Sequence, residues 1–179
     1  KTKQMARKYL GHIKPRGRYT CSPLTSRKLK IGYISADFRE HAVAFYIEPI
    51  LANHDRESFE IFAYYNFPLH DDITERFSKI VDHWRLIDKL SHDSVAALVE
   101  DDEIDILIDL SGYTAGHRLP VFARKPAPIQ ATWIGYFNTT GLPAMDYIIT
   151  DIDLLPPSDE HLFLERSEEH TSELQSQFR

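Results

Sequence analysis

The chain has 179 residues, 42% of them hydrophobic, and this length and composition predict one domain with an apolar core and room for a short appendage. The single cysteine, Cys21, excludes a disulfide framework and a cysteine metal cluster, and it fits a reducing, cytoplasmic compartment. No apolar run follows the basic first residues, and the longest apolar runs have the length of strands, so neither a secretory signal nor a membrane span is expected.

The formal net charge of −6 is unevenly distributed along the chain. Residues 1–30 hold ten of the 21 Lys and Arg and no acid, which leaves 11 basic side chains against 27 acidic ones in the remainder. We expect residues 1–28 to contain the end of a helix from a preceding region, Met5–Ile13, and then a basic connector, Lys14–Lys28. A basic arm could bind nucleic acid. The segment carries no nucleic-acid-binding motif, however, so a solvated linker is the prediction.

Residues 29–165 alternate short apolar runs with segments of helical periodicity. The apolar runs predict strands at 29–35, 59–66, 83–88, 104–110, 129–135 and 145–151. Helical spacing predicts helices at 44–53, 71–80 and 91–100, with Asp71 or Asp72 and Ser91 as N-caps. Six strands separated by helices of about ten residues indicate right-handed crossovers and a parallel sheet covered on both faces, which is a Rossmann-like α/β fold.

Polar loops follow three of these strands: Ser35–His41, Asp109–Arg118 and Tyr136–Gly141. Because an open α/β sheet binds its ligand at the carboxyl ends of its strands, we expect the three loops to meet at one edge. Backbone N–H groups between Gly135 and Gly141, with the hydroxyls of Thr139 and Thr140, suit phosphate or sugar oxygens. The alternative is an ordinary connection, since a turn needs glycine for steric reasons. No spacing in these loops fits a metal site.

The first loop lacks the glycine pattern of a dinucleotide site, so a dehydrogenase is disfavoured. Asp37 and His41 lie four residues apart at the end of the first strand, where an acid–base pair could take the proton of an attacking hydroxyl. In the alternative interpretation Asp37 caps the following helix and His41 is a surface residue.

Four motifs together resemble glycosyltransferase family 41, the family of O-linked N-acetylglucosamine transferase and of SPINDLY-like proteins. They are LKIGYISADFREHAV, IDILIDLSGYTAGHR, FARKPAPIQATWIGY and TTGLPAMDYIITD, and the likeness runs from about Arg7 to Glu165 in the same order and spacing. The resemblance implies a GT-B enzyme, in which two Rossmann-like lobes enclose the active site. Residues 29–165 would be its N-terminal catalytic lobe, preceded by tetratricopeptide repeats and followed by a C-terminal lobe that this chain lacks.

The resemblance also implies the reaction. Family members transfer N-acetylglucosamine from UDP-GlcNAc to Ser or Thr hydroxyls of proteins, with inversion and without a metal or other cofactor. A single lobe is therefore expected to be inactive. Two alternatives remain open: a transferase that uses another UDP-sugar such as UDP-glucose, and a non-catalytic binding module.

The resemblance assigns candidate roles position by position. His41 matches the active-site histidine, Asp37 matches an aspartate proposed as general base, and His12 matches a second essential histidine. The Ile134–Gly141 loop matches the segment that lines the donor sugar and the developing negative charge. The substrate-binding candidates are Thr114, Ile134, Gly135, Phe137, Thr139, Thr140 and Gly141. Ala42 and Phe137 stand where the family usually has proline, and the loss of a fixed φ loosens both loops.

The resemblance stops at Glu165. Residues 166–179 resemble the translation of a sequencing adapter, and we expect this segment to be non-native and disordered or weakly helical. Glu168, Glu169 and His170 should then not form a site.

Overall fold

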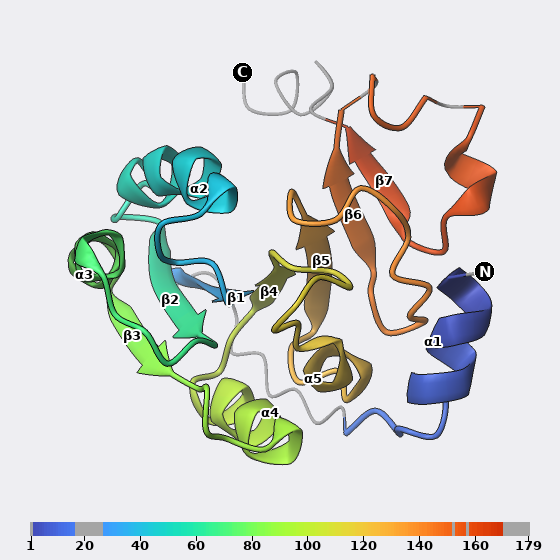
Figure 1. Cartoon of the computed structure of the whole chain (residues 1–179), viewed down its shortest axis with the longest axis horizontal. Coiled ribbons are helices and arrows are strands. Elements are labelled where there is room, and N and C mark those ends of the chain that lie inside the picture. The colour runs from blue at the N-terminus through green and yellow to red at the C-terminus, as the bar shows by residue number, and fades with distance from the viewer. Residues whose placement is uncertain (1, 17–26, 152, 157, 170–179) are drawn as a thin grey trace.

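The computed structural model describes residues 2–16, 27–151, 153–156 and 158–169. Within this part of the chain, seven parallel strands form one sheet in the order β3-β2-β1-β4-β5-β6-β7 (Figure 1). The strands are β1 (Leu29–Ser35), β2 (Phe59–Tyr65), β3 (His83–Leu86), β4 (Ile106–Asp109), β5 (Ile129–Trp133), β6 (Tyr147–Thr150) and β7 (Arg166–Glu169). The predicted α/β fold with a parallel sheet is confirmed.

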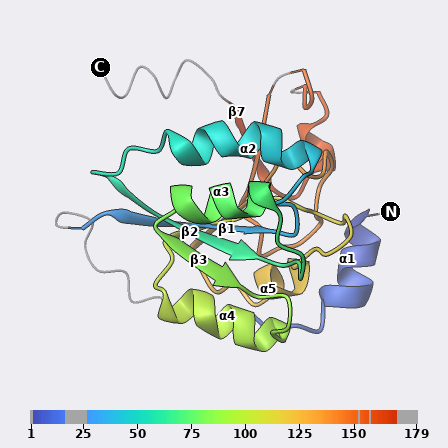
Figure 2. The same ribbon diagram turned by 60° about the vertical axis from the view of Figure 1, so that its left-hand side comes forward.

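Helices cover both faces of the sheet. They are α1 (Thr2–Leu10), α2 (Ala42–Ala52), α3 (Asp72–Ile80), α4 (His92–Asp101) and α5 (Leu119–Ala123), and a short 3₁₀ turn, η2 (Glu160–Leu162), precedes β7. Figure 2 shows α2 and α3 on one side of the sheet and α4 and α5 on the other. Among the described residues, no helix is both long enough and apolar enough to cross a membrane.

The core is divided by the sheet into two apolar clusters. One cluster joins α2 and α3 to the sheet and includes Phe38, Ile47 and Phe77, each with no exposed surface. The other joins α4, α5 and the inner side of α1, where Ala6 and Leu10 are buried. Burial on both faces explains why the central strands β1, β2 and β4 are mostly apolar runs instead of alternating patterns.

The strand order reverses between β1 and β4. From β1 the chain proceeds through β2 to β3 on one side, and from β4 it proceeds through β5, β6 and β7 on the other (Figure 1). The connections that leave β1 and β4 therefore diverge at the carboxyl edge of the sheet. This is where doubly wound sheets place their ligands.

Local boundary signals were predicted well for two helices. Asp71 caps α3 by accepting from the backbone N–H of Thr74, and Ser91 caps α4 by accepting from that of Ser94. Helix α1, predicted at Met5–Ile13, begins and ends three residues earlier than predicted. Helix α5 and the turn η2 were not predicted.

The expectation that the C-terminal segment is disordered or weakly helical was wrong for residues 166–169, whereas its non-native origin stays a prediction. These four residues form β7, which pairs in parallel with β6 from Tyr147↔Arg166 to Thr150↔Glu169. The free edge of β6 offers backbone N–H and C=O groups, and these pair with an extended segment whatever its side chains are. The pattern of Ser and Glu gave no sign of a strand, because strand propensity depends on context. His170 and the rest of the segment lie outside the described residues, as do most of the connector residues, 17–26.

Candidate functional site

The three polar loops meet at the carboxyl edge, as predicted. The Asn66 side chain, after β2, donates to the carbonyl of Gly116 at 2.6 Å, and the backbone of Gly116 lies against Ala36 in the first loop. The hydroxyl of Tyr113 donates to the carbonyl of Thr140 at 2.8 Å, which joins the second loop to the third. Segments far apart in the sequence therefore form one rim.

Two glycines allow close contact between the second loop and residues 135–136, at the start of the third loop. A Cβ at Gly135 would lie 1.9 Å from the carbonyl oxygen of Leu110, and a Cβ at Gly112 would lie 2.1 Å from the Cβ of Tyr136. Gly112 also has a φ of +54°, in the region that favours glycine. The predicted site residue Gly135 is therefore needed for close packing of the rim.

Asp109, the last residue of β4, holds the second loop through hydrogen bonds to its backbone. Its carboxylate has no exposed surface and accepts from the N–H groups of Ser111 at 3.2 Å and Gly112 at 2.8 Å, and from the hydroxyl of Thr132 at 3.0 Å. Burial raises the pKa of Asp109 to about 6, although the three hydrogen bonds to the carboxylate act in the opposite direction. The loop therefore depends on a buried acid that is costly to ionise.

In the first loop, Asp37 is buried and His41 is half-buried. One carboxylate oxygen of Asp37 accepts from Arg39 at 3.4 Å, and the other lies 3.7 Å from Nδ1 of His41. The guanidinium of Arg39 also stacks over the ring of Phe67, 4.5 Å from its centroid. The structure therefore brings the predicted pair together, but not within hydrogen-bonding distance.

The N-cap of α2 is His41 and not Asp37, so the alternative in which Asp37 caps this helix was wrong. Nδ1 of His41 accepts from the backbone N–H of Val43 at 3.2 Å. His41 has the extended backbone of an N-cap, with φ −158° and ψ 154°.

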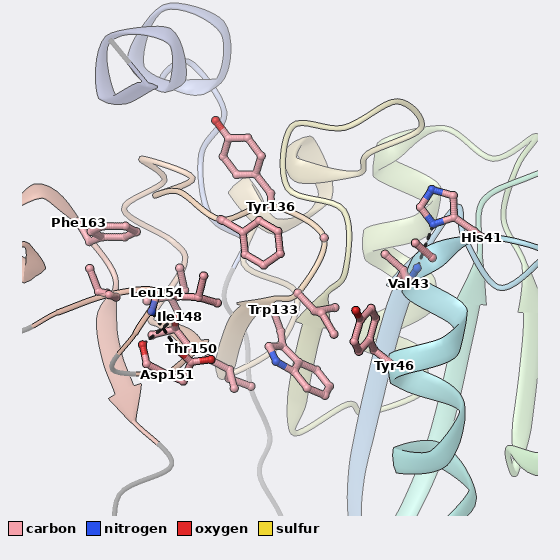
Figure 3. A pocket seen from close by; sticks show the side chains of 16 residues that line it. His41, Val43, Tyr46, Trp133, Tyr136, Ile148, Thr150, Asp151, Leu154 and Phe163 are labelled. Carbon is pink, nitrogen blue, oxygen red and sulfur yellow. Dashed lines mark hydrogen bonds between the residues drawn. The ribbon is translucent and has the colours of Figure 1, made fainter.

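A cleft of about 610 Å³ lies between α2 and the ends of β5 and β6 (Figure 3). Four of the predicted site residues line it: His41, Ile134, Gly135 and Phe137. Apolar and aromatic side chains form most of the wall, which is typical of a ligand pocket with a few polar groups. The remaining lining residues are Ala42, Val43, Tyr46, Trp133, Tyr136, Ile148, Ile149, Thr150, Asp151, Leu154, Leu155 and Phe163.

Ile134 enters this cleft with a strained backbone. Its φ is +58°, which is unfavourable for a β-branched side chain and costs on the order of 1–3 kcal/mol. The turn is held by a 2.7 Å hydrogen bond from the N–H of Gly135 to the carbonyl of Trp133. Strain of this kind often accompanies ligand sites, which supports the assignment of Ile134 to the site.

The two threonines of the third loop are placed differently from the expectation. Thr139 and Thr140 are buried, and both hydroxyls donate to the carboxylate of Glu165, the first at 2.6 Å. The N–H of Thr140 donates to the same carboxylate at 2.7 Å, and the N–H of Gly141 donates to the hydroxyl of Thr139 at 3.0 Å. These groups hold the loop in shape, and none of the three residues lines the cleft. A direct contact between them and a ligand stays a prediction.

Thr114 and His12 also lie away from the cleft. Thr114 is exposed, and its hydroxyl donates to the carbonyl of Ser111 at 2.7 Å. His12 follows α1 and lines a second hollow of about 540 Å³, beside Arg16, His92 and Arg124. The structure does not bring His12 into the cleft of His41, so its role as a second active-site histidine stays a prediction.

Sequence reasoning missed several residues of the site. Tyr46 and Phe163 line the cleft from α2 and from the segment before β7, and Glu165 supports the third loop. Tyr46 is 64% exposed on a helix whose other exposed positions include Phe45 and Ile50, and this apolar outer face was a signal that the sequence contained. No local pattern linked Glu165 to a loop 25 residues away.

The comparisons with known proteins agree with one another. The profile of Glycosyl transferase family 41 matches residues 11–168. The probable UDP-N-acetylglucosamine–peptide N-acetylglucosaminyltransferase SPINDLY of Oryza sativa is 44% identical over 138 residues, or 75% of this chain and 15% of the relative. The probable UDP-N-acetylglucosamine–peptide N-acetylglucosaminyltransferase SEC of Arabidopsis thaliana is 34% identical over 142 residues, or 78% of this chain and 14% of the relative.

A solved structure shares the fold. It is that of a mutant O-GlcNAc transferase of Thermobaculum terrenum, which is 40% identical, with a TM-score of 0.89 over 94% of this chain and 32% of the other. The chain thus spans about 15% of the length of the curated relatives and about a third of the solved chain. Because the profile covers most of the sequence and a relative of known structure has the same fold, the chain belongs to glycosyl transferase family 41.

Proposed function

We propose that this chain is the N-terminal catalytic lobe of an enzyme that transfers N-acetylglucosamine from UDP-GlcNAc to Ser or Thr hydroxyls of proteins. The observation that carries the proposal is the match to an O-GlcNAc transferase over 94% of the chain at 40% identity. The plant relatives SPINDLY and SEC are named as enzymes with a UDP-N-acetylglucosamine donor and a peptide acceptor, in agreement with the proposal.

The geometry suits part of this reaction. Glycosyl transfer needs an acceptor hydroxyl aimed at the anomeric carbon, a path for its proton, and stabilisation of the negative charge that develops on the departing phosphate. The cleft offers His41, aromatic walls and a rigid rim, so this lobe would orient the sugar and the acceptor. Its described lining contains no Lys or Arg, so the charge on the leaving UDP would be stabilised by a second lobe.

The proposal predicts that the 179-residue chain alone has no transferase activity. The measurement is UDP release and peptide glycosylation with UDP-GlcNAc, for this chain and for a longer protein that continues into a second lobe. Robust glycosylation by the chain alone would contradict the two-lobe proposal, and its absence in the longer protein would contradict the transferase function itself.

In the longer protein, His41→Ala should lower kcat/KM by about tenfold or more, because removal of a positioned acid, base or hydrogen-bonding group typically has at least this effect. A matched control is Leu69→Ala, which removes a side chain that is 67% exposed and does not line the cleft. Unchanged kinetics of the His41 variant would make this residue purely structural.

The donor and the absence of a metal requirement are parts of the same proposal. Turnover should persist in EDTA, and UDP-GlcNAc should compete more strongly than UDP-glucose for the site. A reaction that stops in EDTA and recovers with a divalent cation would contradict the metal-independent mechanism. We also propose, from the cysteine content and the resemblance, that the protein acts in the cytoplasm.

A further inference from the structure

The orientation of the His41 ring is fixed by the helix that follows it. The first N–H groups of a helix have no partner within the helix and are satisfied by the N-cap side chain. At α2 this acceptor is Nδ1 of His41, which receives the N–H of Val43 at 3.2 Å. The dashed line in Figure 3 marks this bond, and the other ring nitrogen points away from the helix.

The cap determines which ring nitrogen carries the proton. A nitrogen that accepts a hydrogen bond has no proton, so the neutral ring of His41 carries its proton on Nε2. Asp37 does not impose the opposite tautomer, since its carboxylate lies 3.7 Å from Nδ1 and the single lone pair of Nδ1 already faces Val43. An Asp–His pair that makes Nε2 a base has the reverse arrangement, in which the carboxylate accepts from Nδ1–H.

The Nε2–H group is available to a ligand. The side chain of His41 is 39% exposed and lines the cleft. Among the hydrogen bonds of the described residues, only the contact of Nδ1 with Val43 involves the ring of His41. The ring therefore presents a donor, and not a lone pair, to the cleft.

We propose that His41 acts as a hydrogen-bond donor, through Nε2–H, to an oxygen of the bound sugar nucleotide, and that it is not the general base. This inference rests on the proposed function for the identity of the ligand. If His41 took the acceptor proton at Nε2, it would first have to move its own proton to Nδ1 and give up the cap of α2. The proton of the acceptor hydroxyl must therefore leave to another group.

The first test reads the tautomer directly in the 179-residue chain and needs no activity. Long-range ¹H–¹⁵N correlation spectra of ¹⁵N-histidine-labelled protein distinguish a protonated from an unprotonated ring nitrogen, and spectra over a series of pH values separate the neutral ring from the charged one. The signals of His41 are identified by their loss in His41→Asn. We expect a protonated Nε2 and an unprotonated Nδ1, and a protonated Nδ1 would overturn the proposal.

The second test separates the cap from the outward donor with a pair of substitutions. His41→Asn keeps a good N-cap acceptor but has no group at the position of Nε2, whereas His41→Gln can place an amide N–H near that position but is a poor cap. In the longer protein, we expect His41→Asn to keep the melting temperature and to lose kcat/KM about tenfold or more, the same loss that we expect for His41→Ala. His41→Gln should melt lower and retain more activity than His41→Asn.

Binding of UDP-GlcNAc, measured by calorimetry on the same variants, separates the two proposals. Weaker binding by His41→Asn than by His41→Gln supports the donor role, and equal binding and activity of His41→Asn and the wild type overturns it. If the longer wild-type protein binds UDP-GlcNAc but shows no turnover, the proposed transferase function is contradicted and the proposed donor role of His41 is not. If it does not bind UDP-GlcNAc, both proposals are contradicted.

Discussion

The buried carboxylate of Asp109 provides a quantitative test of the rim. Burial raises its pKa from the ordinary value of 3.8 to about 6. Since one pKa unit corresponds to about 1.36 kcal/mol, ionisation of Asp109 costs the folded state about 3 kcal/mol. The sign follows from proton binding: between these two pKa values the folded state binds more protons than the unfolded state, so this group lowers the stability as the pH rises.

The perturbation is Asp109→Asn, which removes the charge and retains the shape. One of the N–H groups of Ser111 and Gly112 would then face the amide –NH₂ instead of an oxygen, at a cost of about 1–3 kcal/mol. Below pH 3.8 the variant should therefore be less stable than the wild type. Above pH 6 the difference should vanish or reverse, because the wild type then bears the cost of the buried charge.

The assay is urea unfolding of both proteins at a series of pH values, followed by circular dichroism. The free energy of unfolding of the wild type minus that of the variant should fall by about 3 kcal/mol from below the lower pKa to above the higher one. Asp101→Asn, at the exposed end of α4, controls for the loss of one carboxylate from the total charge. A difference that stays constant, or that grows with pH, would refute the assignment of a costly buried ionisation to Asp109.

Two further predictions concern the third loop. Gly135→Ala should lower the free energy of unfolding by about 1–3 kcal/mol or more, because its Cβ would meet the backbone of Leu110 at 1.9 Å. The control Phe137→Ala removes a side chain that is 69% exposed and should change the stability little. Equal effects of the two substitutions in thermal melts would argue against close packing of the rim. Glu165→Ala leaves several buried donors without an acceptor and should lower the free energy of unfolding by about 3 kcal/mol or more. The control Glu57→Ala, at an exposed position, should lower it little. A Glu165 variant as stable as the wild type in urea unfolding would show that the carboxylate does not hold the loop.

The sequence predicted those features that depend on neighbouring residues. The apolar runs became the strands β1 to β6, and the caps Asp71 and Ser91 lie at the ends of α3 and α4. The convergence of the three loops could also be predicted, since the carboxyl ends of parallel strands must lie at the same edge. These signals are local or follow from a general rule of topology, so they do not require knowledge of long-range partners.

Other features could not be predicted from the sequence, because they depend on contacts between segments that are far apart along the chain. Thr139 and Thr140 have the composition of an oxygen-binding loop, but their hydroxyls are taken by Glu165 on a segment that returns to the sheet beside β6. Residues 166–169 became a strand because an unpaired edge was available to them. In both cases the deciding partner lies about 20 or more residues away, where periodicity and spacing carry no information.

The sequence by itself therefore determined the fold class, the carboxyl-edge location of the site and the candidacy of His41, because hydrophobic periodicity and turn chemistry act over a few residues. Only the tertiary structure decided which of those candidates face the cleft, that His12 lies in a separate hollow, and that the ring of His41 is oriented by α2. Burial, hydrogen-bond partners and tautomers follow from distances between segments, and these distances exist only once the sheet has been assembled.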